Sequence, residues 1–121
     1  MSSRSLVVKV TVGKEEPERC NQAFTVAATA ASSGVPVSLW LTGESSWFAL
    51  PDRCDDLQLP HAAPLPDLFA RVLAEGTVTV CAQCAARREI GEDDVTDGVR
   101  IAGAATFVAE ALAEGAQALV Y

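Results

Sequence analysis

The chain has few positive charges and a single histidine. Its 121 residues include nine Lys and Arg against 16 Asp and Glu, so the formal net charge is −7. Affinity for nucleic acid depends on neutralising phosphates with basic side chains, and an anionic lipid surface makes the same demand. We therefore expect the chain to bind neither nucleic acid nor a membrane.

Long apolar runs and nucleotide-binding motifs are also missing. No stretch approaches the roughly 18 apolar residues of a membrane span, and Lys9 interrupts the short apolar run near the start that could otherwise serve as a signal-peptide core. There is no G-x-G-x-x-G or P-loop pattern, and residues 42–46 are only a weak anion-loop candidate. We expect a cytoplasmic protein, whose four cysteines serve catalysis, metal binding or packing rather than disulfides.

Strand-like and helix-like segments alternate along the whole sequence. Half of the residues are hydrophobic, enough for one domain over residues 1–121 with one core. Strands are predicted at residues 5–12, 35–41, 77–80, 99–101 and 117–121, and helices around 17–33, 66–75, 82–88 and 104–114. The last helix is expected to bury Phe107, Val108, Ala111 and Leu112. This alternation predicts an α/β fold with a mainly parallel sheet covered on both faces.

Cys81 stands where a strand ends and a helix begins. Residues 77–80 are all β-branched, and residues 82–88 are good helix formers without Gly or Pro. Chemistry in open parallel sheets gathers at the carboxyl ends of strands, and a helix N-terminus favours a thiolate over a thiol. The sequence therefore predicts a reactive cysteine at this corner.

Several neighbours are candidates to assist Cys81. Cys84 lies three residues on, at the spacing that stacks two side chains on one helical face, and Arg88 follows on that face. Arg88 and Arg87 are expected to add positive potential near the sulfurs and to bind substrate. Trp47, after the second strand, is predicted either to wall the Cys81 pocket, to form a subunit contact, or to pack under the long loop.

The run Val78-Thr79-Val80-Cys81, followed by Arg87-Arg88, resembles the DsrE/DsrF-like family of small sulfur-handling proteins, which includes the TusD-type relay subunits. The resemblance extends through residues 98–103 to the last strand. It implies a three-layer α/β/α sandwich with a five-stranded, mainly parallel sheet, and a homotrimer or homohexamer. It also implies that Cys81 carries sulfane sulfur as a persulfide, exchanged with donor and acceptor proteins or small thiols.

Cys84 keeps other functions open. As a C-x-x-C pair, Cys81 and Cys84 are also typical of a dithiol-disulfide oxidoreductase, and a non-catalytic oligomeric scaffold with packed cysteines is the third alternative. A structural zinc site needs a second ligand pair, whereas Cys20, Cys54 and His61 are scattered. We therefore expect no metal and no cofactor.

Overall fold

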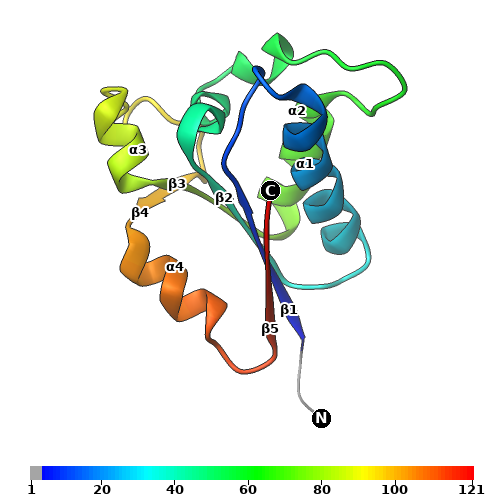
Figure 1. Cartoon of the computed structure of the whole chain (residues 1–121), viewed down its shortest axis with the longest axis vertical. Coiled ribbons are helices and arrows are strands. Elements are labelled where there is room, and N and C mark those ends of the chain that lie inside the picture. Colours follow the sequence, from blue (N-terminus) through cyan, green and yellow to red (C-terminus); the bar gives the residue numbers. More distant parts are fainter. Residues whose placement is uncertain (1–3) are drawn as a thin grey trace.

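A five-stranded sheet forms the centre of the molecule (Figure 1). In this computed structural model, which describes residues 4–121, the strand order is β4-β3-β2-β1-β5 and every neighbouring pair is parallel. The elements in chain order are β1 (Ser5–Val10), α1 (Pro17–Ser32), β2 (Val37–Leu41), the 3-10 helices η1 (Gly43–Ala49) and η2 (Arg53–Asp56), α2 (Leu65–Glu75), β3 (Thr77–Cys81), α3 (Ala82–Arg87), β4 (Arg100–Ala102), α4 (Ala104–Ala111) and β5 (Ala116–Val120). The predicted α/β class and five strands are confirmed.

The main core lies between the sheet and the helices α1 and α2. Figure 1 shows these two helices side by side on one face of the sheet, with α4 on the other. The apolar face of α1 is largely alanine, which lets the helix approach the strands closely, and Phe24 fills the centre. Its ring packs edge-on against Phe48 from η1 and beside Phe69 from α2. This layer positions the carboxyl ends of β1, β2 and β3 as one rigid edge.

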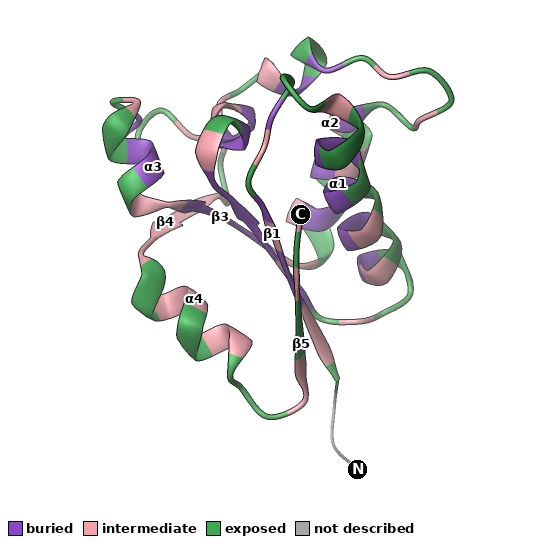
Figure 2. Ribbon diagram, in the orientation of Figure 1, coloured by how far each residue is buried: buried purple, intermediate pink, exposed green. Residues whose placement is uncertain are grey.

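The helix α4 packs loosely on the other face of the sheet. The prediction that this helix buries Phe107, Val108, Ala111 and Leu112 is wrong. No residue of α4 is buried; Val108 is 50% exposed and Leu112 is 81% exposed. Figure 2 shows α4 and β5 mostly exposed or half-buried, in contrast to the buried central strands. The helix is rotated so that Phe107 and Glu110 contact the sheet. Val108 and Leu112 then face outward.

Several boundaries also differ from the prediction. The last helix ends at Ala111 instead of residue 114, and the segment after β2, which lies outside the predicted helices, holds two 3-10 helices. A capping box at Thr42 and Ser45 starts η1, because each residue's side chain pairs with the other's backbone N–H. The chain after β2 is therefore held against the carboxyl edge of the sheet.

Candidate functional site

Cys81 is the last residue of β3 and directly precedes α3. It pairs in register with Ala102 of β4, and it is half-buried. Successive strand side chains alternate between faces, so Cys81 and Thr79 point to the α4 side, whereas Val80 points into the main core. The thiol thus lies at the carboxyl edge of the sheet, on the face that α4 leaves partly open.

Cys84 is held close to Cys81 by the first turn of α3. It is buried, and its Sγ accepts a hydrogen bond from the backbone N–H of Gly43 in η1 at 3.3 Å. Gly43 has φ +57, and a Cβ there would lie 2.6 Å from the backbone oxygen of Thr11. Only glycine therefore lets the backbone bring this N–H up to the Cys84 sulfur without strain.

The environment of Cys81 favours its thiolate. Burial alone would raise the pKa of Cys81, but hydrogen bonds from the backbone of Cys84 and Gln83, the side chain of Cys84 and the charge of Lys9 outweigh it. The net effect lowers the pKa of this thiol below its ordinary value. A lowered pKa increases the thiolate fraction near neutral pH, which is the nucleophilic form.

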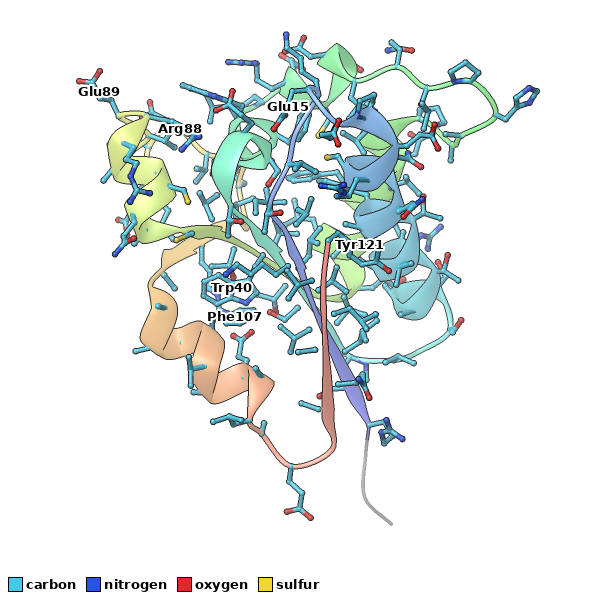
Figure 3. The ribbon with its side chains drawn as sticks, in the orientation of Figure 1. Glu15, Trp40, Arg88, Glu89, Phe107 and Tyr121 are labelled. Carbon is cyan, nitrogen blue, oxygen red and sulfur yellow. The ribbon has the colours of Figure 1, made fainter. Side chains whose placement is uncertain are left out.

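Arg88 makes contacts that the sequence did not predict. Its Nη2 and Nε contact Glu44 Oε2 at 2.7 and 3.1 Å, and its Nη1 donates to the carbonyl oxygen of Cys84 at 3.1 Å. Its charge is therefore matched by Glu44, and it fastens η1 to α3, near the end of which Figure 3 shows it. The side-chain charge that lowers the pKa of Cys81 comes from Lys9 instead.

Trp47 lies in a separate hollow. The guanidinium of Arg53 stacks over its ring, 5.0 Å from the centroid, and the hollow is also lined by Lys14, Glu44 and Asp56. Glu44 links this hollow to the site of Cys81 and Cys84, because its carboxylate also pairs with Arg88 at the end of α3. Arg87 is exposed on α3. The substrate-binding roles assigned to Trp47 and to the two arginines stay predictions.

A network of polar side chains fills the space between the sheet and α4. The Oε1 atom of Glu110 accepts hydrogen bonds from Ser38 Oγ at 2.6 Å and from Trp40 Nε1 at 2.9 Å, and its other oxygen pairs with Arg100. Arg100 Nε donates to Thr79 Oγ1 at 2.6 Å. Burial alone would raise the pKa of Glu110, but these hydrogen bonds lower it overall. This network fixes α4, and with it Phe107, over the strands below Cys81.

Comparison with protein-family models identifies the family of this chain. The model of the DsrE/DsrF-like family matches residues 4–121. The chain belongs to the DsrE/DsrF-like family. That family is associated with sulfur relay, and the match covers the strand that ends at Cys81 and the helix that follows it.

Solved structures of this fold agree over nearly the whole chain. The YchN protein of E. coli superposes with a TM-score of 0.80 at 16% identity, covering 98% of this chain and 99% of that one. MTH1491 of Methanobacterium thermoautotrophicum gives 0.73 at 9% identity, covering 98% and 100%. BT1422 of Bacteroides thetaiotaomicron gives 0.62 at 14% identity, covering 97% and 95%.

A curated relative matches in sequence. The uncharacterized protein MJ0760 of Methanocaldococcus jannaschii is 30% identical over 99 residues, which is 81% of this chain. The chain spans only 36% of the length of that relative. The likeness therefore concerns this one unit of the longer protein.

Cys20, Cys54 and His61 lie outside β3 and α3, the two elements that carry Cys81 and Cys84. Burial, followed by nearby negative charges, raises the pKa of Cys20 and of Cys54 to about 12 in each case. Both are buried and behave as core residues. His61 is exposed in the loop before α2. Among residues 4–121, no three His, Cys, Asp or Glu side chains stand close enough to hold a metal ion, and no helix has the length and hydrophobicity to cross a membrane.

Sequence reasoning missed most of what lies beneath α4. Lys9, Trp40, Thr79 and Arg100 form one row across four neighbouring strands, since each pairs in register with the next. The period-two alternation within each strand could have indicated which of them share a face. Their alignment across strands depends on register, which no local pattern in this sequence encodes. Glu110, which joins the row to α4, carries no signal of its own in the sequence.

Proposed function

We propose that the protein is a sulfur carrier of the sulfurtransferase type, which passes sulfane sulfur through a persulfide on Cys81. The observation that carries this proposal is the placement of Cys81: a half-exposed thiol with a lowered pKa at the carboxyl end of a central strand. The raised pKa values of Cys20 and Cys54 argue against a nucleophilic role for either of them. Family membership supports the same reaction class.

The proposed transfer needs no external oxidant or reductant. The Cys81 thiolate attacks the terminal sulfur of a polysulfide dianion, one S–S bond breaks, and a polysulfide shorter by one sulfur leaves with the electron pair. The product is the Cys81 persulfide anion. An acceptor thiolate then attacks its outer sulfur, forms a new persulfide and releases Cys81 as a thiolate. The carrier returns to its starting state.

A second candidate function rests on the closeness of Cys84. Its thiolate attacking the inner sulfur of the Cys81 persulfide would release hydrosulfide and form a Cys81–Cys84 disulfide, which two small thiols then reduce. The first turn of α3 brings the two cysteines together, and this supports the reaction. Its burial and its hydrogen bond from Gly43 disfavour attack by Cys84 on any larger substrate.

The proposed partners and assembly follow from the same features. Sulfur donors and acceptors are proteins or small thiols, and the proposed compartment is the cytoplasm, which suits four cysteines that are all free thiols. We propose a homotrimer or homohexamer, because the outward side chains of Val108, Leu112 and Val120 leave apolar surface for a neighbouring copy to cover. A monomeric mass in light scattering at micromolar concentration would contradict this assembly.

Mass spectrometry after incubation with inorganic polysulfide tests the function. Persulfide formation adds about 32 Da to the peptide that carries Cys81. We expect this adduct in the wild type and in Cys84→Ser, and none at that position in Cys81→Ser. A loss of about 2 Da across both cysteines after mild oxidation would favour the dithiol reaction instead. If neither mass change is found, the result favours the scaffold alternative.

A further inference from the structure

Lys9 and Cys81 lie on the same face of the sheet. Lys9 of β1 pairs in register with Trp40 of β2, which pairs with Thr79 of β3, and Cys81 follows two residues further along β3. With strands about 4.8 Å apart and a rise of about 3.3 Å per residue, the two Cα atoms are about 12 Å apart. A lysine side chain spans about half of that distance, so its ammonium group acts on the sulfur through space.

Aromatic rings hold the ammonium group in place. Lys9 Nζ lies 4.9 Å from the ring centroid of Phe107, within the range of a cation–π contact. Phe107 in turn packs edge-on against Trp40, with the centroids 5.4 Å apart and the planes at 85°. Figure 3 shows these two rings together between the sheet and α4. Trp40 is itself fixed by its hydrogen bond to Glu110, so the ring under the ammonium group is well supported.

Two ion pairs near this site match the charges of their own members. Glu110 of α4 pairs with Arg100 of β4, and Glu44 of η1 pairs with Arg88 next to α3. Lys9 takes part in none of the ion pairs found among residues 4–121. Its partner in register on β5, Val120, is apolar. Arg87 of α3 is also outside these ion pairs, but it is exposed and solvent screens its charge. Lys9 is half-buried beside Phe107, and no carboxylate of these ion pairs cancels its field at Cys81.

We propose that Lys9 is a positioning residue of this site, whose ammonium group stabilises the anionic sulfur of Cys81 and favours its reaction with negatively charged sulfur donors over neutral ones. The inference rests on the proposed function for its biological meaning, since it concerns the donor for the same cysteine. A thiolate that attacks an anion must overcome like-charge repulsion, and a fixed cation on the same face of the sheet lowers that barrier. The reaction rate with a neutral donor rises only because a larger fraction of Cys81 is thiolate, since no like-charge repulsion has to be overcome.

Alkylation with reagents of different charge tests this directly. Iodoacetate is anionic, whereas iodoacetamide is neutral and nearly the same size. We expect Lys9→Gln to shift the pH profile of Cys81 alkylation upward, and to lower the iodoacetate-to-iodoacetamide rate ratio at high pH by about two- to fivefold, a modest factor because solvent screens the charge. Lys9→Arg should restore both. Phe107→Leu, which keeps an apolar cover but removes the ring face, should lower the ratio less.

A matched control removes a positive charge from the opposite side of the sheet. Arg71→Gln on α2 changes the net charge by the same amount and should leave the pH profile and the ratio as in the wild type. Peptide mapping assigns the label to Cys81. If Lys9→Gln changes neither quantity, or slows both reagents equally without moving the pH profile, Lys9 is not the positioning cation. If the charge effect holds but polysulfide leaves no persulfide on Cys81, the proposed function fails and this inference stands.

Discussion

Replacing Glu110 should destabilise the protein clearly, because its carboxylate joins three donors. Glu110→Ala removes hydrogen bonds from Ser38 and Trp40 and the ion pair with Arg100. Trp40 is only 1% exposed, so its indole N–H would lose its partner in a place that water does not reach.

The magnitude follows from these contacts. A buried donor without a partner costs about 1–3 kcal/mol, and a hydrogen bond to a charged acceptor contributes about 1.5–3 kcal/mol net. The ion pair adds less than about 1 kcal/mol, since 41% of the Arg100 side chain is exposed and solvent screens it. We expect Glu110→Ala to lower the free energy of unfolding by about 3 kcal/mol. Glu110→Gln keeps an acceptor for Trp40 and should cost about 1 kcal/mol.

The pH dependence provides an independent check. The folded-state pKa of Glu110 lies below its unfolded value, because hydrogen bonds from Ser38, Trp40 and Arg100 outweigh burial. Its stabilising contribution is therefore fully present above the unfolded pKa of about 4.3 and is lost as the pH falls through the folded pKa. The wild type should consequently lose more stability than Glu110→Gln between about pH 5 and pH 3.

Urea unfolding followed by tryptophan fluorescence, at one fixed protein concentration, measures both effects. Glu75→Gln is the matched control, because its carboxylate pairs with Arg71 on the surface at 3.6 Å and should change stability by less than about 0.5 kcal/mol. A Glu110→Ala protein as stable as this control would refute the reasoning. Equal acid sensitivity of the wild type and Glu110→Gln would refute the linkage.

Three further predictions follow from the described contacts. Gly43→Ala should cost more than about 1 kcal/mol in urea unfolding, because φ is +57 and the new Cβ would lie 2.6 Å from a backbone oxygen; an unchanged midpoint would contradict this. Cys20 and Cys54, whose pKa values burial raises to about 12, should resist alkylation at pH 8 in the folded protein and react only on unfolding, as peptide mapping can show. Leu112→Glu should leave the free energy of unfolding of the subunit within about 0.5 kcal/mol, since 81% of the side chain is exposed, but reduce the mass in light scattering; an unchanged mass would separate this exposed surface from assembly.

The sheet could be predicted because its signals are local. β1 and β3 are rich in β-branched residues, and turn residues such as Gly34 and Gly76 separate strands from helices. The position of Cys81 at a strand end was readable for the same reason. The parallel direction of the strands was predictable from the alternation, because consecutive parallel strands need a crossover connection, usually a helix.

The surroundings of Cys81 were less predictable, because they come from distant parts of the chain. Trp40 meets Glu110 across 70 positions, and Glu44 meets Arg88 across 44 positions. A helix pattern suggests which residues of α4 are apolar, but not which of its faces meets the sheet. Glu110 decides that rotation through its hydrogen bonds from Ser38 and Trp40 and its ion pair with Arg100, and Leu112 then faces outward. From the sequence alone, Lys9 is noted only because it interrupts an apolar run. The same rotation of α4 brings Phe107 next to the Lys9 ammonium group.

The position of β5 has a consequence for the order in which the molecule folds. Ser5–Lys9 of β1 pair with residues more than a hundred positions away, in the last strand of this sheet along the chain, whereas the β1–β2 pairing closes a shorter connection. Contacts between such distant residues form slowly, because a long loop must close first. Until then the outer edge of β1 presents unpaired N–H and C=O groups to other chains. A nascent chain stalled before Ala116 should therefore be especially prone to aggregate.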